Sequence, residues 1–136
     1  MMTLGIAALA AFSCAVVRWY LDRSSRREES FGGWLHLTAL WNERGAFGLP
    51  LKGTALTAVS AAVLALVPSL AKRCRIGAGL ILGGGLSNLW ERARHGRVYD
   101  YLRFPRAPKP LRRYVYNLAD LAIFTGTAME IGRAHV

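Results

Sequence analysis

The chain has 136 residues, of which 53% are hydrophobic, and its 18 Lys and Arg against eight Asp and Glu give a formal net charge of +10. One domain is expected at this length, and the long uncharged runs exclude an ordinary soluble domain. The same runs favour anionic lipid headgroups over nucleic acid as the partner of the basic residues. We therefore expect contact with membrane phospholipid and no nucleic acid.

Four hydrophobic runs predict four membrane-spanning helices. The first, Met1–Val17, carries no charge and is followed by Arg18, Trp19 and Tyr20, which are typical of a membrane interface. Because no Lys or Arg precedes this run, we expect a retained span rather than a cleaved signal peptide. The third and fourth runs reach spanning length only if polar residues at their ends lie at the interface or inside the bundle. The expected spans cover roughly residues 1–21, 53–71, 76–92 and 114–129.

The connections between these runs differ in length. The short link Lys72–Arg75 predicts that the second and third helices are antiparallel neighbours, whereas residues 22–52 and 93–113 form longer loops. Within the first loop, Trp34–Trp41 alternates in side-chain character with a period of two, which predicts a short strand. In the second, Arg94–Arg113 is rich in Arg, Pro and aromatic residues and is interpreted as a basic surface segment on headgroups. We expect an all-α membrane protein with a small β element.

Three further features have mainly structural interpretations. The glycines Gly83–Gly85 lack the rest of a phosphate-binding motif and lie in an apolar run, so they favour close helix packing. Cys14 and Cys74 lie in or beside apolar runs without metal-ligand spacing, which favours buried thiols over a disulfide or zinc site. We expect no metal and no cofactor, because the three histidines also lack metal-ligand spacing. These histidines are His36, His95 and His135.

The last seven residues, Glu130–Val136, can be encoded by a nucleotide string that begins like a common sequencing adapter. We expect this segment to be an adapter artefact, so that the natural chain differs after Met129. Such segments are excluded from fold reasoning.

Two aspartates are the strongest candidates for chemistry. Asp120 lies inside the fourth apolar run, where a carboxylate costs about 2.5–3.5 kcal/mol at mid-helix. Asp100 follows the third run, so the two can meet at one membrane face. Two close carboxylates share a proton, which allows one to act as a base toward water while the other polarises a carbonyl. A purely structural bridge from Asp120 to Arg92 or Arg113 explains these residues equally well.

Four segments resemble motifs of signal peptidase II, the bacterial lipoprotein signal peptidase family. That family shows G-G-x-x-x-N-x-x-D-R, then G-x-V-x-D, and later [FY]-N-x-A-D, with D-x-x-x-K after its first span and N-x-G-A-A-F-[GS] in the outer loop. The four segments occur in the same order over nearly the whole chain. They are Gly84–Asp100 (GGLSNLWERARHGRVYD), Tyr116–Asp120 (YNLAD), Asp22–Arg26 (DRSSR) and Asn42–Gly48 (NERGAFG).

The resemblance implies a four-helix aspartyl endopeptidase that cleaves the signal peptide from diacylglyceryl-modified prolipoproteins. It implies a monomer in the bacterial cytoplasmic membrane, multi-pass, with an extracytoplasmic β element and the active site near the outer face. Asp100 and Asp120 match the family's catalytic pair. The residues that match substrate-binding or supporting positions are Asn42, Asn88, Arg92, Asn117, Asp22 and Glu91.

Several positions depart from the family pattern. Glu91 stands where the family has Asp, and Arg44 stands where it has Gly in the outer loop. Gly45 replaces the first Ala and Arg26 replaces the Lys. These departures leave the aspartates intact and bear on substrate fit. The alternative function is a non-catalytic lipopeptide- or lipid-binding membrane protein on the same scaffold.

The distribution of basic residues opposes the orientation that the resemblance implies. Arg18–Lys52 holds six Lys and Arg, Glu91–Arg113 holds eight, and Lys72–Arg75 holds three. The positive-inside rule would place the two long loops in the cytoplasm, whereas the family has them outside. We expect the family orientation, because the rule weakens where basic residues have structural partners. An inverted membrane protein of unrelated function is the third alternative.

Overall fold

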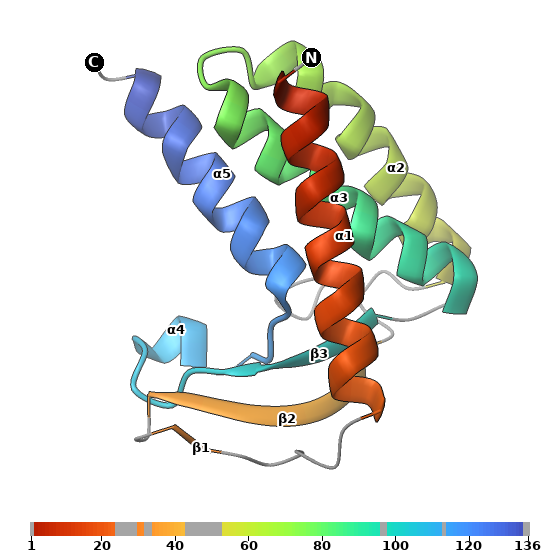
Figure 1. Ribbon diagram of the computed structural model, residues 1–136, viewed down its shortest axis with the longest axis vertical. Helices are drawn as coiled ribbons and strands as arrows, with labels where there is room; N and C mark the ends of the chain where they lie inside the picture. The colour runs from red at the N-terminus through yellow and green to blue at the C-terminus, as the bar shows by residue number, and fades with distance from the viewer. Residues whose placement is uncertain are drawn as a thin grey trace.

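The computed structural model describes residues 2–23, 30–31, 34–42, 53–95, 98–112 and 114–134, and most of them are helical. A small sheet accompanies the helices (Figure 1). In chain order, the elements are α1 (Met2–Arg23), β1 (Ser30–Phe31), β2 (Leu35–Asn42), α2 (Gly53–Leu70), α3 (Arg75–His95), β3 (Val98–Arg103), α4 (Lys109–Arg112) and α5 (Leu118–Ala134).

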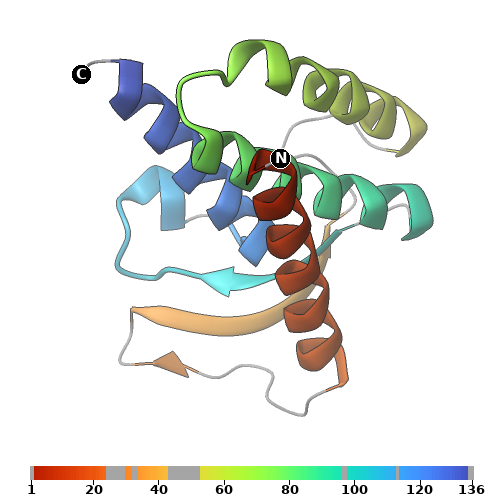
Figure 2. The same ribbon diagram turned by 45° about the horizontal axis from the view of Figure 1, so that its top comes forward.

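Helix α3 is the central element of the bundle. It packs against α1, α2 and α5, and its most extensive contacts are with α1 and α5. The sheet lies at one end of the bundle and both termini lie at the other (Figure 1). Figure 2 shows α2 on the side of the bundle away from the sheet. The short connection between α2 and α3 makes them neighbours, as expected from the sequence.

The glycines Gly83–Gly85 explain how α3 can contact three helices at once. Successive residues of a helix point about 100° apart, so three in a row face three directions. An added Cβ at these positions would lie 2.5, 2.5 and 2.6 Å from the nearest atom of a neighbouring helix. The expectation of close packing is confirmed. The neighbours, in chain order, are Ala7 of α1, Ala119 of α5 and Leu64 of α2.

The sheet has the antiparallel order β1-β2-β3. Strand β2 confirms the strand expected over Trp34–Trp41. The interpretation of Arg94–Arg113 as a basic surface segment was wrong in its first half, because residues 98–102 of β3 are buried. The strand VYDYLR pairs with β2 on one side, and its apolar and aromatic side chains pack against the helices. Basic residues on either side of this strand concealed it in the sequence.

The chain between α4 and α5 is tied to β3 by backbone hydrogen bonds. The N–H groups of Tyr101 and Leu102 donate to the carbonyl of Tyr116, and the Tyr116 N–H donates to Leu102 at 2.7 Å. Tyr99, Tyr101, Leu102 and Tyr116 form one buried cluster. Because this backbone pairs with the strand, it cannot be helical. Helix α5 therefore begins at Leu118, four residues later than the apolar run suggested.

Helix α5 continues to Ala134, and Glu130 near its end contacts the start of α3. The Glu130 carboxylate accepts the N–H groups of Arg73 at 3.1 Å and Cys74 at 2.8 Å. This contact favours an antiparallel arrangement of α3 and α5. The adapter origin of Glu130–Val136 stays a prediction.

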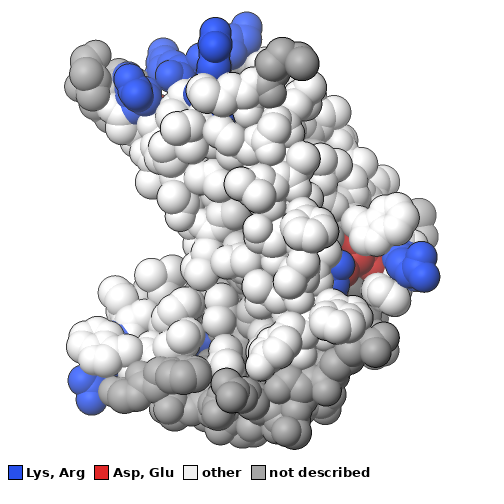
Figure 3. Space-filling model, in the orientation of Figure 1, with Lys and Arg blue, Asp and Glu red and all other residues white. Residues whose placement is uncertain are grey.

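Large hydrophobic side chains are exposed on the helices, among them Leu9, Phe12 and Leu66. Within the described part of the chain, one helix, over Met2–Leu21, is long and apolar enough to cross a membrane, and Ala55–Leu70 is a shorter apolar helix. Figure 3 shows Lys and Arg gathered at the end with the termini and again near the sheet, with an uncharged surface between them on this face.

Candidate active site

Asp120 and Asn117 bind one another at the start of α5. The Asn117 side-chain oxygen accepts the Asp120 N–H at 2.9 Å, and Asp120 Oδ2 accepts the Asn117 N–H at 3.0 Å. Asn117 is therefore the N-cap, and Asp120 closes a reciprocal capping box from the third helical position. Asp120 therefore lies in the first turn of α5 and not deep within the helix. In the first turn, the helix dipole stabilises a carboxylate.

Asn88 of α3 joins this cap from the neighbouring helix. Its side-chain nitrogen donates to Asp120 Oδ1 at 3.2 Å, and its oxygen accepts from Asn117 Nδ2 at 3.0 Å. Asn88 lies four residues after Gly84, and residues four apart share one face of a helix. The close contact of Gly84 with Ala119 therefore sets the distance at which Asn88 can reach Asp120.

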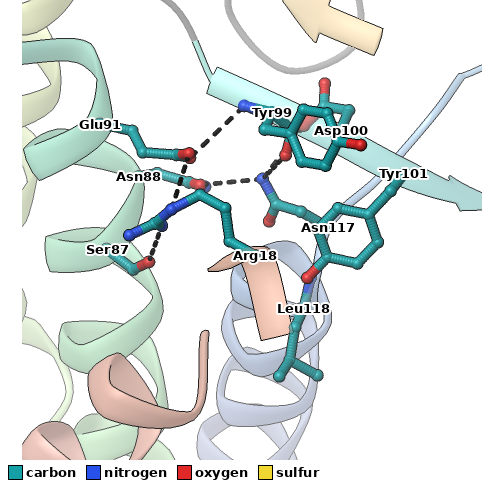
Figure 4. A network of polar contacts seen from close by, with 9 residues as sticks. All are labelled: Arg18, Ser87, Asn88, Glu91, Tyr99, Asp100, Tyr101, Asn117 and Leu118. Atoms are coloured by element: carbon teal, nitrogen blue, oxygen red, sulfur yellow. Dashed lines mark hydrogen bonds and ion pairs between the residues drawn. The ribbon is translucent and has the colours of Figure 1, made fainter. Parts of the chain in front are cut away.

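Asp100 enters the same network from β3. Asp100 is only 4% exposed, and its Oδ1 accepts a hydrogen bond from Asn117 Nδ2 at 3.1 Å (Figure 4). Asn117 is also 4% exposed, and its Nδ2 lies 3.4 Å from the Tyr99 carbonyl oxygen. Asn117 thus contacts both aspartates: its side-chain nitrogen donates to Asp100, and its side-chain oxygen and backbone N–H bind Asp120. The three residues bring β3 and α5 together at the end of α3.

The tyrosines on either side of Asp100 anchor its backbone. The Tyr99 N–H donates to Glu91 Oε2 at 3.4 Å. The Tyr101 hydroxyl accepts the N–H of Leu118 at 2.9 Å (Figure 4). Burial raises the pKa of the Tyr101 hydroxyl above its ordinary value, so the group stays neutral. Asp100 is consequently held between a contact to α3 and a contact to α5.

Charged side chains from α1 and α3 surround the aspartates. Arg92 is half-buried, and its charge interacts with the carboxylates of Asp100 and Asp120. Glu91 is 2% exposed, and its Oε1 lies 3.1 Å from Nε of Arg18. Sequence reasoning missed Arg18, which it assigned to the membrane interface. The available signal was a cation, Arg18, at the end of the apolar first run and an acidic side chain, Glu91, at the end of the third.

The remaining expected site residues lie at the edge of the described structure. Asn42 is the last residue of β2 and pairs with Val98 at the start of β3, and Asp22 lies in the last turn of α1. Their side chains lie outside the described part, as does all of Arg44. No cluster of three or more potential metal ligands occurs within the described ranges.

An apolar cavity of about 350 Å³ lies between α1, α3 and α5. It begins at Leu118, the residue after Asn117, and extends along α5 to Thr125. Its lining is almost wholly apolar, so it suits a hydrocarbon or an apolar peptide segment. The lining residues are Ile6, Leu9, Ala10, Ser13, Cys14, Leu80, Leu118, Leu121, Ala122 and Thr125.

Comparison with known proteins places the chain in one family. The family model described as "Signal peptidase (SPase) II" matches residues 5–134. The lipoprotein signal peptidase of Nitrobacter hamburgensis is 35% identical over 102 residues, covering 66% of this chain and 62% of that protein. The lipoprotein signal peptidase of Pelotomaculum thermopropionicum is 40% identical over 99 residues, covering 67% and 61%.

Two solved structures share the fold. One, described as "Bacterial membrane enzyme structure by the in meso method at 2.3 A resolution", has a TM-score of 0.79 and 18% identity, covering 95% of this chain and 84% of that one. A second bacterial membrane enzyme, at 1.9 A resolution, has a TM-score of 0.78 and 18% identity, covering 98% and 92%.

The fold and the family match define a membrane protein with a mainly helical core. The chain belongs to the signal peptidase II family, because the family model covers almost its whole length. It spans about three fifths of the length of the two curated relatives described above.

Proposed function

We propose that this protein is a membrane aspartyl endopeptidase that removes the signal peptide from lipid-modified prolipoproteins. The observation that carries the proposal is the convergence of Asp100 and Asp120 on Asn117. Family membership and the name lipoprotein signal peptidase of its relatives support the substrate class. The apolar cavity beside Leu118 supports it further, because such a substrate presents hydrocarbon and an apolar peptide near the cut.

The first step requires the two carboxylates to be in different protonation states. Two carboxylates in one site do not both ionise easily, so the pair holds one proton. The ionised aspartate takes a proton from water as the water oxygen attacks the scissile carbonyl carbon. The protonated aspartate donates its proton to the carbonyl oxygen, which gives a neutral tetrahedral intermediate. Asn117 Nδ2 holds Asp100 oriented for this exchange.

The second step cleaves the C–N bond. The aspartate that took the proton from water gives it to the leaving nitrogen, and the other aspartate recovers its proton from the intermediate. The pair is thereby restored, and no cofactor is needed. Arg92 offsets the negative charge that the pair retains throughout, because it interacts with both carboxylates.

The test is substitution of each aspartate by its near-isosteric amide. Asp100→Asn and Asp120→Asn should each abolish cleavage of a diacylglyceryl-modified precursor, read by gel shift with purified protein in nanodiscs. The double variant should be little worse than either single one, since residues that act as a unit are non-additive. Full cleavage by a well-folded Asp120→Asn protein would contradict the aspartyl-peptidase mechanism. A wild-type protein that binds precursor without cutting it would favour the lipopeptide-binding alternative.

The proposal includes a placement in the membrane. A single membrane domain would cross the bacterial cytoplasmic membrane as a monomer with α1, α2, α3 and α5, and the sheet would lie at the outer face with the site beneath it. The uncharged surface between the two charged ends supports this placement (Figure 3). The packing of the basic residue Arg18 against Glu91 supports it too, because such a residue has a structural partner and weighs little in the positive-inside rule.

Single cysteines can test the orientation. In a background lacking Cys14 and Cys74, a cysteine at Ala107, between β3 and α4, should react with an impermeant thiol reagent added from outside whole cells. A cysteine at Lys72, in the connection between α2 and α3, should react only after permeabilisation. The reverse pattern would mean that the count of basic residues gives the correct orientation and that the sheet lies in the cytoplasm.

A further inference from the structure

Glu91 and Arg18 form a buried ion pair between two helices. The carboxylate of Glu91 belongs to a residue that is 2% exposed, and its Oε1 lies 3.1 Å from Arg18 Nε, whose side chain is 22% exposed. Arg18 also donates from Nη1 to Ser87 Oγ at 3.5 Å, one turn before Glu91 on α3 (Figure 4). A carboxylate this deeply buried is tolerated only when a partner compensates its charge. Arg18 supplies that compensation from α1.

The second oxygen of Glu91 reaches the strand that carries Asp100. Glu91 Oε2 accepts the Tyr99 N–H at 3.4 Å, and the Tyr99 carbonyl accepts from Asn117 Nδ2 at 3.4 Å. Both peptide groups of Tyr99 are therefore held, one from α3 and one from the cap of α5. Asp100 is the next residue, so its carboxylate direction depends on where Tyr99 is held.

The length of the Glu91 side chain suits this double contact. One oxygen must face α1 and the other must face β3, and the extra methylene of Glu relative to Asp extends its reach in both directions. The Arg18 guanidinium forms an ion pair with the first oxygen, which makes no hydrogen bond to the described residues, and the second oxygen is aimed at the strand (Figure 4). Without the cation, the buried carboxylate would turn toward water, and this change would weaken its contact with Tyr99.

From these contacts we infer that Arg18 and Glu91 are a positioning pair for Asp100, an inference that rests on the proposed peptidase function. Arg18 touches neither aspartate directly. It acts through Glu91 and Tyr99 on the backbone that presents Asp100. The role predicts a loss in turnover rather than in substrate binding, because the misplaced group is the one that reacts.

The experiment compares Arg18→Met with Arg18→Lys and with the control Arg94→Met, which removes an exposed cation from the same end of α3. Purified proteins in nanodiscs are assayed with a diacylglyceryl-modified precursor. Arg18→Met should lower kcat about 10- to 100-fold and change KM less than about threefold. Arg18→Lys should recover most of kcat, and Arg94→Met should match the wild type. The double variant Arg18→Met/Glu91→Gln removes the buried charge and keeps an acceptor for the Tyr99 N–H. Its kcat should be higher than that of Arg18→Met alone.

A second measurement reports on positioning without catalysis. Amide hydrogen exchange at Tyr99, measured well below the melting temperature of each variant, should accelerate in Arg18→Met, and it should return toward the wild-type rate in the double variant. This inference alone would be overturned if the wild type cleaves the precursor, Asp120→Asn does not, and Arg18→Met keeps the wild-type kcat. A wild type that never cleaves would overturn the proposed function and this inference together.

Discussion

The two halves of α3 pack by different means. Its N-terminal half buries small residues and approaches its neighbours backbone to backbone, whereas its C-terminal half buries polar groups that form hydrogen bonds and an ion pair. The buried residues of the first half are Gly77, Ala78, Gly79, Gly83 and Gly84, and those of the second are Ser87 and Glu91.

The comparison separates distance from chemistry. The glycine half fixes how closely α1 and α5 approach α3, and it contains no group that could react. The polar half supplies side chains that orient the site. At the helix separation that the glycines allow, Asn88 reaches Asp120 and Glu91 reaches Tyr99. A change in the first half should therefore disturb both stability and activity. A well-chosen change in the second half should disturb activity alone.

The largest effect is expected from Gly84→Leu. An added Cβ would lie 2.5 Å from the Ala119 carbonyl oxygen, so α5 must move away from α3. Overpacking of this kind costs typically about 1–3 kcal/mol of stability, and it also separates Asn88 from Asp120. We expect a lower melting temperature in detergent and no measurable cleavage of a lipid-modified precursor.

A matched glycine serves as the control for that change. An added Cβ at Gly5, in α1, meets no atom within 4 Å. Gly5→Leu should therefore leave both the melting temperature and cleavage close to wild type. If Gly84→Leu behaved like Gly5→Leu, the glycine half would not set the helix distance, and the comparison between the halves would fail.

The next effect is expected at Asn117, which combines the cap with the contact to Asp100. Asn117→Ser keeps a good N-cap oxygen for the Asp120 N–H, but it loses the amide that reaches Asp100 and Asn88. Cleavage should fall about 10²-fold, because Asp100 loses its orienting donor. The melting temperature should change little.

Asn117→Ala removes the cap as well as the amide. Its cleavage should match that of Asn117→Ser, whereas its stability should be lower by a further 0.5–2 kcal/mol, roughly the cost of losing an N-cap. Chemical denaturation measures the stability difference. Equal stability of the two variants would show that the cap contributes nothing, and the orienting role of Asn117 would then rest on the Asp100 contact alone.

Sequence reasoning found the apolar runs, one strand and the glycine packing, because these depend on local composition and periodicity. It mislocated the start of α5, because an apolar stretch does not reveal that Tyr116 pairs with β3. It also placed Asp120 inside a span, since Asn117 three residues earlier was not recognised as a cap. Arg18 was missed for a different reason: its partner Glu91 lies far along the chain, and only the packing of α1 on α3 brings them together.

The smallest effect on cleavage is expected from Tyr101→Phe, which leaves the buried ring and removes only the hydroxyl. The N–H of the half-buried Leu118 loses its acceptor, which costs at most the roughly 1–3 kcal/mol of a fully buried unsatisfied donor. Cleavage should fall only a few-fold, because Asp100 keeps its contact with Asn117. Thermal denaturation and the gel-shift assay measure the two effects.

The pH dependence of this variant gives a sharper test. Burial raises the pKa of Tyr101 in the folded protein above its ordinary value of 10, so at higher pH the unfolded chain loses this proton first. Stability tied to the neutral hydroxyl is present below about pH 10 and is lost as pH rises through the folded-state pKa. The wild type should therefore lose its advantage over Tyr101→Phe above about pH 10, as measured by denaturant unfolding at several pH values. A stability difference that stays constant across this range would mean that the hydroxyl is not buried as described, and the link between β3 and the cap of α5 would have to be sought in the Asn117 contacts instead.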